Sequence, residues 1–409
     1  MKPRCASFAA LVVALLASLG VTAPAHAAFP APAGLAATSS SSNAIAVRWD
    51  PVPNAFGYRV DYATRSDFVG LTKETTTSTT RVLKNGTRGL LPGTRYYFRV
   101  MVIDRNLSPV GPPSTTANYT TKPAMKFAVA SYNIKNPDSS SARPWTWRCP
   151  LIGQDIAKLA IRVVGVQEVY GSNDRQELLD CINAAAGGQF FSMTPGPGSD
   201  AGNDSRVIFD TRAFRLLASG AYAYPTQFAG ETSRQMSWAK LEYLATDRVV
   251  LFTTTHLSPS SDAVDVKQWD QLIAHVNRVK AVSPVPTYVI FTGDFNSTKF
   301  ELPSRTQLSK MRSSGYEDVL GQQYRSYSTY RNPTARVDAW ISTSNRNKPD
   351  LRQCGCLVST DRNANSIDYV FVSSALKALY YRTYAQPRRG YVMDYLLSDH
   401  FMAVAVISE

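Results

Sequence analysis

Residues 249–296 read VVLFTTTHLSPSSDAVDVKQWDQLIAHVNRVKAVSPVPTYVIFTGDFN and contain a strand, a helix and a second strand in succession. Residues 249–255 and 287–292 are runs of apolar and β-branched side chains, which are typical of strands. The segment between them, residues 263–280, carries apolar side chains at helical spacing: Trp269, Leu272, Ile273, Val276 and Val279. Strands that alternate with helices and are apolar throughout indicate sheets that are covered by helices and buried on their other face.

The same alternation begins earlier in the chain. Residues 127–133 (Phe-Ala-Val-Ala-Ser-Tyr-Asn) are strand-like, and residues 161–166 form a second, almost continuously apolar strand. An amphipathic helix is predicted between them, because its apolar positions fall on one face: Leu151, Ile152, Ile156 and Leu159. Residues 124–409 are therefore predicted to form one α/β domain.

Residues 28–123 differ in composition, being rich in Ser, Thr and Pro. Stretches of period-two alternation, such as residues 44–49 (Ala-Ile-Ala-Val-Arg-Trp), predict half-buried strands separated by turns. In Trp49 and in the segment Leu-Leu-Pro-Gly-Thr-Arg-Tyr-Tyr-Phe-Arg-Val at residues 90–100, this region resembles a fibronectin type III domain, with Tyr96 as its corner tyrosine. The resemblance implies an all-β sandwich that precedes the α/β domain.

The fibronectin-like region carries no catalytic constellation. It contains no His and no Cys, and its eleven basic residues exceed its five acidic ones. A spacer, or a module for cell-surface or polysaccharide contact, is favoured over a module that itself grips substrate, because a fold alone supplies no function.

The amino terminus has the pattern of a secretory signal peptide. Lys2 and Arg4 precede an almost wholly apolar run over residues 8–21, and residues 25–27 (Ala-His-Ala) form a small-x-small cleavage site. The run is shorter than the ~20 apolar residues that cross a bilayer, and no second run of comparable length follows. Removal of residues 1–27 is therefore expected, which predicts a secreted protein without a transmembrane segment.

Four cysteines follow the signal peptide: Cys149, Cys181, Cys354 and Cys356. An even number in an oxidising compartment predicts disulfides, and the spacing disfavours a structural zinc site. Three connectivities exist. The one we favour joins Cys149 to Cys181 across a loop of about 30 residues and leaves Cys354 to Cys356.

Polar residues stand at the ends of the predicted strands. Asp368 lies within the strand-like residues 367–372, and five clusters directly follow apolar strands: Asn133, Gln167-Glu168, His256, Asp294 with Asn296, and Asp399-His400. Taken singly, each has a structural explanation, such as turn formation at Asp294 or a satisfied buried histidine at His256. Six such coincidences favour one functional site, since side chains at strand ends converge on one edge of a sheet.

In this order the motifs resemble the full set of the endonuclease/exonuclease/phosphatase family, which includes deoxyribonuclease I. They span nearly all of residues 124–409 and are Tyr132-Asn133, Gln167-Glu168, Thr255-His256-Leu257, Gly293-Asp294-Phe295-Asn296, Ile367-Asp368-Tyr369 and Ser398-Asp399-His400. The resemblance implies a four-layered α/β sandwich, with two packed sheets flanked by helices and the site in a cleft at one edge. It also implies metal-dependent hydrolysis of phosphoric esters.

The resemblance implies a metal cluster at Glu168, with Asn133 and Asp399 near it. Carboxylate and amide oxygens suit a hard divalent cation, Mg²⁺ or alternatively Mn²⁺ or Ca²⁺. Such an ion relieves the charge on the non-bridging phosphate oxygens and stabilises the leaving oxygen.

The other motif residues take proton-transfer and positioning roles by the same resemblance. His400 would accept the proton of the attacking water, with Asp368 orienting the imidazole and stabilising its charged form. Asp294 and Asn296 would position the water and the phosphate, or help to hold a second ion. His256 would donate a hydrogen bond or a proton toward the phosphate or the leaving group.

The sequence departs from the family pattern at the support of the first histidine. Relatives carry a carboxylate or tyrosine there, and none can be placed between Gln189 and Tyr224, so His256 is either a full general acid or only a phosphate binder. Arg206 and Arg234 stand in stretches that face the cleft in relatives, and a guanidinium matches phosphate bidentately.

A nuclease, acting as an endonuclease or an exonuclease, is the predicted function. Residues 293–296 and 367–370 resemble family members that act on DNA, and the net charge of +13 favours a polyanionic partner. The alternative is a lipid-headgroup phosphodiesterase of sphingomyelinase type or an inositol-phosphate phosphatase. A non-catalytic adhesion protein is the second alternative, and a monomer is expected.

Overall fold

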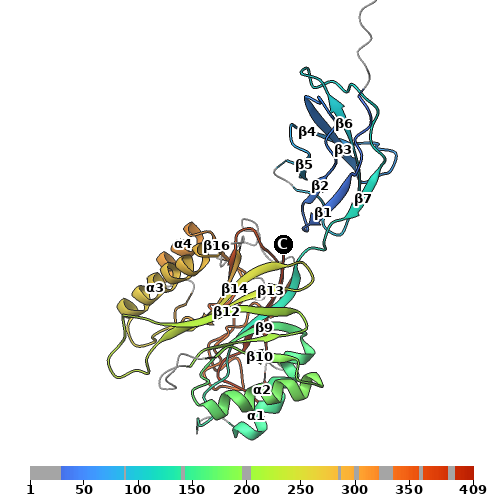
Figure 1. Ribbon diagram of the computed structural model, residues 1–409. Helices are drawn as coiled ribbons and strands as arrows, with labels where there is room; N and C mark the ends of the chain where they lie inside the picture. Colours follow the sequence, from blue (N-terminus) through green and yellow to red (C-terminus); the bar gives the residue numbers. More distant parts are fainter. Residues whose placement is uncertain are drawn as a thin grey trace, which may run out of the picture. The chain divides into compact units, whose positions relative to one another are not determined.

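The computed structural model of the chain describes residues 29–409 except 87–88, 140–142, 196–203, 284–286, 299–303, 322–334, 359–362 and 386–391. The predicted signal peptide, residues 1–27, lies outside the described residues. The chain forms two compact units, one built mainly from residues up to Tyr119 and the other mainly from Thr120 to Glu409 (Figure 1).

The first unit is all-β, as predicted. Its two sheets have the strand orders β1-β2-β5 and β4-β3-β6-β7. The strands are β1 (Ala36–Ser40), β2 (Ile45–Arg48), β3 (Gly57–Ala63), β4 (Thr72–Thr76), β5 (Thr80–Leu83), β6 (Arg95–Ile103) and β7 (Ala117–Thr120). Trp49 is buried and its ring contacts Tyr58 edge-on, with 5.3 Å between the centroids. Such a buried aromatic pair stabilises the contact beyond the area that it removes from water.

The second unit contains two mixed sheets. The first has the order β10-β11-β9-β8-β20-β19-β17 and the second the order β12-β13-β14-β15-β18-β16. The first sheet consists of β10 (Phe191–Met193), β11 (Arg206–Asp210), β9 (Ile161–Gln167), β8 (Lys126–Asn133), β20 (Met402–Ser408), β19 (Lys377–Tyr384) and β17 (Ala335–Val337). The second consists of β12 (Phe214–Ala223), β13 (Gln235–Tyr243), β14 (Arg248–His256), β15 (Thr287–Asp294), β18 (Asp368–Ser373) and β16 (Tyr316–Asp318).

The two sheets pack face to face around one apolar core. Buried side chains of the first sheet, among them Val129 and Val163, meet those of the second, among them Phe252 and Ile290. The sheets approach each other closely at Gly165 of β9, where a Cβ atom would lie 2.1 Å from the Thr292 hydroxyl oxygen and 2.6 Å from that of Thr254. Only glycine fits there, because real Cβ atoms do not approach neighbours so closely.

Helices cover the outer faces of both sheets. α1 (Trp145–Lys158) and α2 (Ser172–Ala186) pack on the first sheet, and α3 (Asp262–Ala281) packs on the second, where α4 (Ser304–Ser313) lies beside it (Figure 1). The predicted four-layered α/β sandwich is therefore confirmed. Within the described part of the chain, no helix has both the length and the apolar character that a bilayer span requires.

Strand direction brings the polar strand ends to one edge of the two sheets. β8 and β9 run parallel, with Asn133 opposite Gln167, and β14 and β15 run parallel, with His256 opposite Asp294. β18 is antiparallel to β15 and pairs Asp368 with Asp294. The first residue of β18 therefore lies at the same edge as the last residue of β15.

Two motifs stand at strand beginnings rather than where the sequence placed them. Asp399 and His400 precede β20 instead of following a strand, and Asp368 is the first residue of β18 instead of an interior one. Alternating apolar runs do not reveal strand direction, so a start on an antiparallel strand and an end on a parallel one look alike in sequence. Both arrangements lead to the same edge.

Two disulfides are present among the described residues. Cys149 of α1 is bonded to Cys181 of α2, and Cys354 is bonded to Cys356. This is the connectivity that the sequence favours. The first bond joins the two helices that cover one sheet and spans a sequence separation of 32 residues, whereas the second spans 2.

Removal of the bond between the helices is expected to be the more destabilising. In the chain-entropy model a Cys149→Ser, Cys181→Ser variant loses about 3 to 4 kcal/mol, whereas Cys354→Ser, Cys356→Ser loses about 1.5 kcal/mol, because a short loop restricts the unfolded chain less. Denaturant unfolding of both variants measures the difference. A larger loss in the Cys354 and Cys356 variant would contradict this ordering.

Candidate active site

The floor of the site is a single carboxylate flanked by two imidazoles. Asp294 ends β15, and its Oδ2 atom lies 3.5 Å from Nε2 of His400 and 3.6 Å from Nε2 of His256. All three side chains are buried. Both histidines therefore direct their Nε2 atoms at Oδ2 of Asp294. His256 does so from the end of β14, and His400 from just before β20.

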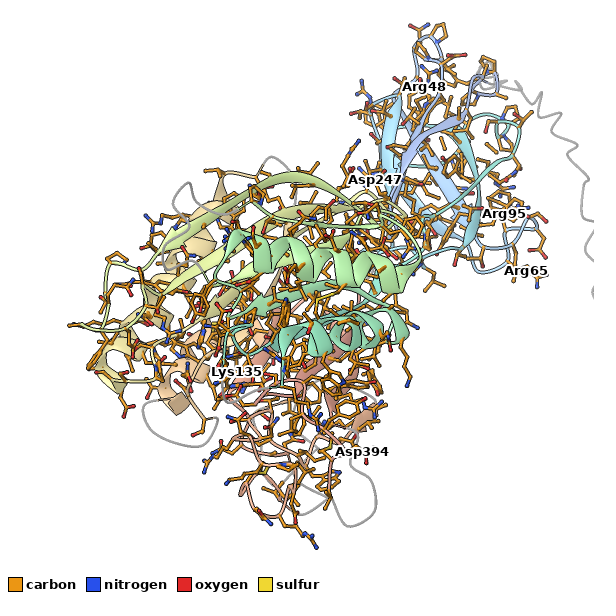
Figure 2. All side chains as sticks on the ribbon, turned by 90° about the horizontal axis from the view of Figure 1, so that it is seen from below. Arg48, Arg65, Arg95, Lys135, Asp247 and Asp394 are labelled. Carbon is orange, nitrogen blue, oxygen red and sulfur yellow. A yellow bond between two sulfur atoms is a disulfide. The ribbon has the colours of Figure 1, made fainter. Side chains whose placement is uncertain are left out.

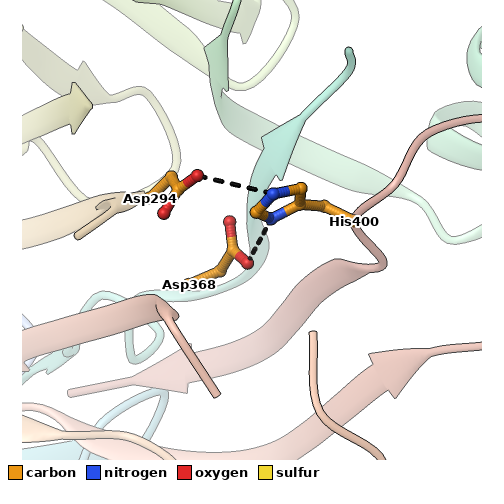
Figure 3. Close-up of side chains that lie close together, drawn as sticks. All are labelled: Asp294, Asp368 and His400. Carbon is orange, nitrogen blue, oxygen red and sulfur yellow. Dashed lines mark hydrogen bonds and ion pairs between the residues drawn. The ribbon is translucent and has the colours of Figure 1, made fainter. Parts of the chain in front are cut away.

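Each histidine is held from behind by its own aspartate. Nδ1 of His400 lies 2.8 Å from Oδ2 of Asp368, as Figure 3 shows. Asp368 itself is anchored through its backbone N–H, which donates to the Thr343 hydroxyl at 3.1 Å. An aspartate on Nδ1 fixes the ring orientation and leaves Nε2 free to exchange a proton.

Charge governs the protonation of His400. Burial of the imidazole disfavours the protonated form, but the carboxylates of Asp368 and Asp294 outweigh burial and raise the pKa of His400 to about 10. The ring is therefore strongly basic. Its proton affinity depends on the negative charge that surrounds it.

Asp204 is the residue that the sequence did not reveal. Its Oδ2 atom lies 2.6 Å from Nδ1 of His256, so it takes the position toward His256 that Asp368 takes toward His400. Asp204 falls inside the interval from Gln189 to Tyr224 in which no support could be identified. Burial disfavours a charged His256, but Asp204 outweighs burial and raises the pKa of this imidazole.

One sequence signal could have identified Asp204. It stands two residues before the apolar strand β11, which is antiparallel to β9, so it lies at the edge where β9 ends in Gln167. The backbone carbonyl of Asp204 accepts a hydrogen bond from the N–H of Val169 at 3.0 Å. The preceding polar, glycine-containing segment resembles a loop, which hides the residue from a search for strand ends.

An Asp204→Asn variant is expected to lower the pKa of His256 and to reduce kcat on the order of 100-fold, because the imidazole loses the charge that stabilises its protonated form. The pKa can be followed by NMR of the His256 ring protons and kcat by hydrolysis of a phosphodiester. Asp210→Asn is a matched control, since Asp210 is also buried but pairs with arginines, including Arg212 at 2.8 Å. An unchanged His256 pKa would contradict the assigned contact.

The two arginines of the sequence prediction lie in different places. Arg234 lines the cleft, and its guanidinium lies 3.5 Å from both Asp204 and Glu231. Arg206 does not line it: its side chain is 1% exposed within β11 and donates to the Ser205 carbonyl at 2.8 Å. The prediction for Arg206 failed on position, because the inward face of a strand cannot be assigned from one arginine.

An acidic corner adjoins the imidazoles. Glu168 directly follows β9 with φ +66°, a left-handed conformation that is uncommon for a residue with a side chain. Its carboxylate accepts hydrogen bonds from the Asn133 amide at 2.9 Å and from the backbone N–H of Asn136 at 2.8 Å. Backbone strain of this kind concentrates at functional sites, where the surrounding contacts hold it.

Asn133 acts as a donor in this arrangement. Its amide nitrogen lies 2.9 Å from Glu168 and 3.1 Å from Asp294, and its oxygen accepts from the backbone N–H of Lys135. The sequence assigned Asn133 to the metal ligands. In the structure its amide group stands between the two carboxylates and is placed to orient them.

Lys135 is a second residue that the sequence did not single out. Its ammonium lies 2.9 Å from Oδ2 of Asp399. Burial disfavours the ammonium, but contact with Asp399 and the charge of Glu168 outweigh it and raise the pKa of Lys135. A cation already paired with these carboxylates shows that the corner attracts positive charge.

The donor chemistry fits a hard divalent cation. Glu168 and Asp399 both line the cleft and offer carboxylate oxygens, the ligands that Mg²⁺ prefers while it keeps several waters. Asp294, Asp368 and His400 also lie close enough for one ion. We favour the acidic corner, because Nδ1 of His400 and Oδ2 of Asp368 already contact each other.

The cleft itself is open and polar, with a volume of about 640 Å³. Asn296 joins its wall: its backbone N–H donates to Asp294 at 3.0 Å and its amide donates to the Leu257 carbonyl at 2.9 Å. The remaining lining residues are Lys135, Asn136, Ser139, Glu168, Tyr170, Thr232, Arg234, His256, Pro259, Asp294, Asp399 and His400. Of the site residues predicted from the sequence, all but Arg206, Asp368 and Asn133 line this cleft.

Two family models match the chain. The model of the fibronectin type III domain matches residues 30–117, and that of the endonuclease/exonuclease/phosphatase family matches residues 129–400, well over half of the chain. No curated protein matches it.

Solved structures of low sequence identity share the fold. A family protein of Bacteroides thetaiotaomicron is 18% identical with a TM-score of 0.54, covering 70% of this chain and 96% of that one. The mannosyl-6-phosphatase of the same organism is 20% identical with a TM-score of 0.53, covering 69% and 99%. A family protein of Bacteroides vulgatus is 16% identical with a TM-score of 0.54, covering 69% and 98%. At these identities the likeness extends to the fold of the second unit alone.

Proposed function

The chain belongs to the endonuclease/exonuclease/phosphatase family, whose members are phosphoester hydrolases that generally use divalent metal ions, and on that premise we propose that it is a metal-dependent phosphodiesterase acting on nucleic acid. The observation that carries the proposal is the pair of aspartate-supported imidazoles on either side of Asp294. Hydrolysis of a phosphodiester requires one proton to be removed from water and one to be supplied to the leaving oxygen. Two imidazoles next to the same carboxylate could act as the base and the acid.

His400 is proposed as the base. Its Nε2 atom takes the proton of a water as the water oxygen bonds to phosphorus, and Asp368 stabilises the imidazolium that forms. Asp294 lies within 3.5 Å of the same nitrogen and is placed to orient that water. A positioned general base typically contributes about 10²- to 10⁴-fold to the rate, so the placement of His400 beside Asp294 should have a large effect on kcat.

His256 is proposed as the donor. Held by Asp204 in its protonated form, it gives its Nε2 proton or a hydrogen bond to the phosphate or to the oxygen that leaves when the P–O bond breaks. The aspartate contact supplies the support that could not be placed from the sequence, and a supported imidazole suits a general acid as well as a phosphate binder.

Glu168 and Asp399 would hold the divalent ion, with Asn133 orienting Glu168. When bound, the ion would relieve the charge on the non-bridging phosphate oxygens and stabilise the leaving oxygen. Lys135 and Arg234 stand on the same cleft surface and attract the phosphate by charge.

Nucleic acid is proposed as the substrate because the cleft is open, polar and flanked by cations, and because the whole chain carries a net charge of +13. An open cleft admits a polymer that continues past the reacting phosphate on both sides. Endonucleolytic and exonucleolytic action both fit this shape.

The test is a substrate panel on the purified protein, with Mg²⁺ and with chelator. Single-stranded DNA, RNA and plasmid are compared with sphingomyelin vesicles, inositol phosphates and mannose 6-phosphate, with His400→Ala as the inactive control. Mg²⁺-dependent cleavage of nucleic acid is expected. Release of phosphocholine or inorganic phosphate without cleavage of any nucleic acid would show that the substrate is a lipid or a phosphate monoester instead. No hydrolysis of any substrate would favour a binding protein.

Export is also part of the proposal, supported by the pattern of residues 1–27. The secreted product is expected to begin at Ala28. Amino-terminal sequencing of the protein from culture medium tests this, and retention of the full-length chain in the cell pellet would contradict it.

A further inference from the structure

We propose that Trp147, Tyr395 and Arg143 form a subsite that stacks a base of single-stranded nucleic acid next to the reacting phosphate. The inference rests on the proposed function and names a contact surface that the catalytic residues do not use. It assigns a role to a partly exposed aromatic pair that belongs to no buried core cluster.

The pair is built at the start of α1 and in the loop before β20. The rings of Trp147 and Tyr395 meet edge-on, with centroids 5.1 Å apart and planes at 88°. The Arg143 guanidinium lies over the Trp147 ring at 4.8 Å. Tyr395 keeps 41% of its surface exposed, so an aromatic ring remains accessible after these contacts are made.

The subsite adjoins the acidic side of the cleft. A buried guanidinium, that of Arg148, donates to the carbonyls of Arg143, Lys135 and Leu397 at 2.8, 3.0 and 3.0 Å. These hydrogen bonds connect Lys135, which lines the cleft, to the segment of Arg143 and to the segment that contains Tyr395. Figure 2 labels Lys135, which lines the cleft, and Asp394, the neighbour of Tyr395 in sequence.

A hollow lies beside the rings. It has a volume of about 190 Å³ and is lined in part by Arg143, Tyr395 and Ser398, and Ser398 immediately precedes Asp399 of the acidic corner. We therefore place the unit next to the reacting phosphate in this hollow, against Tyr395. Asp394 is the acidic member of this lining.

A segment with two cations borders the same hollow. Asn347 and Pro349 line it, and their neighbours in sequence, Arg346 and Lys348, are exposed. That segment is fixed to the site, because the backbone N–H of Asn345 donates to the Asp399 carbonyl at 2.8 Å.

Aromatic rings interleaved with cations favour nucleic acid over an uncharged glycan. Every base has a face that stacks on an aromatic ring, with a contribution of about 1 to 3 kcal/mol per base, and the cations follow a backbone that carries one charge per nucleotide. A glycan would stack on the same rings but would leave Arg143, Arg346 and Lys348 without matching charge. Stacking also explains why the subsite would read no particular sequence.

The test measures binding and turnover in Tyr395→Ala and Trp147→Ala. Affinity for a fluorescent single-stranded oligonucleotide in chelator is expected to fall about 5- to 150-fold, the equivalent of one lost stack. The ratio of kcat/KM for the oligonucleotide to kcat/KM for bis(4-nitrophenyl) phosphate should fall by a similar factor, because the small ester does not reach the rings. Tyr395→Phe should restore both, and Tyr119→Ala, a tyrosine of the first unit with 42% exposure, is the matched control.

A second pair of changes keeps the inference testable if the alanine variants fold poorly. Arg346→Gln with Lys348→Gln should flatten the log-log salt dependence of oligonucleotide binding by about 0.7 for each phosphate contact removed. An unchanged salt slope would overturn the role of these cations.

The outcomes separate this inference from the proposed function. Cleavage of oligonucleotide and small ester by the wild type, with unchanged affinity in both alanine variants, overturns the subsite alone. Loss of affinity for a phosphorylated oligosaccharide instead of the oligonucleotide overturns it in favour of a glycan. No hydrolysis of either substrate by the wild type overturns the proposed function itself.

Discussion

A His400→Ala variant is expected to lose about 10²- to 10⁴-fold in kcat toward a phosphodiester while its melting temperature stays close to that of the wild type. Like that of His256, the His400 imidazole has a supporting carboxylate on Nδ1 and an Nε2 atom facing Asp294, and it stands before β20 rather than in an apolar core. Steady-state kinetics and thermal unfolding measure the two effects.

The shape of the pH profile distinguishes a base from a structural residue. For the wild type, kcat/KM should rise with pH up to about 10, because His400 can accept a proton only after it has lost its own, and this rising limb should disappear in His400→Ala. His275→Ala is the matched control, because His275 lies on α3 and stacks on Tyr222 with 4.0 Å between the ring centroids. A full rising limb in His400→Ala would assign the base elsewhere.

Chelation of divalent cations is expected to abolish activity, and Glu168→Gln to reproduce most of that loss. An ion at the acidic corner supplies several kcal/mol of charge stabilisation, which corresponds to at least about 10³-fold in rate. Glutamine keeps the size of the side chain and removes its charge, so the variant should bind Mg²⁺ more weakly in calorimetry and should recover activity only at higher Mg²⁺ concentration.

Glu177→Gln provides the control for this variant, because Glu177 is an exposed residue of α2 outside the cleft. It should leave both Mg²⁺ affinity and turnover unchanged. Equal Mg²⁺ affinity in Glu168→Gln and the wild type would move the ion to another set of ligands, with Asp294 and Asp368 the next group to test.

The sequence predicts most residues of the candidate site, including Asp368, but it misses the aspartate behind His256 and the lysine of the acidic corner. His256, Asp294 and His400 could be found because each follows or precedes an apolar run that identifies a strand. Asp204 and Lys135 could not be found in this way. Asp204 stands after a segment whose sequence is typical of a loop, and Lys135 lies two residues beyond the end of β8. A contact between side chains that are 52 residues apart, as His256 and Asp204 are, depends on strand order, which a single sequence does not reveal.

The fold class was predictable for a similar reason. Buried strands and amphipathic helices leave periodic signals, whereas the inward or outward face of an isolated polar residue leaves none. Arg206 is an example. It is the first residue of β11, and the sequence does not show that its side chain is buried and does not line the cleft.

The close approach of the two sheets at Gly165 has a consequence for the proposed catalysis. Glu168, Asp399 and His400 are carried by the first sheet, whereas Asp294, Asp368 and His256 are carried by the second. The proposed base and its supporting carboxylate therefore belong to different sheets, and the thickness of the apolar layer between the sheets fixes their separation. A substitution that widens that layer, many residues away from any substrate, would detune proton transfer before it unfolds the protein, because close-packed interiors transmit such strain.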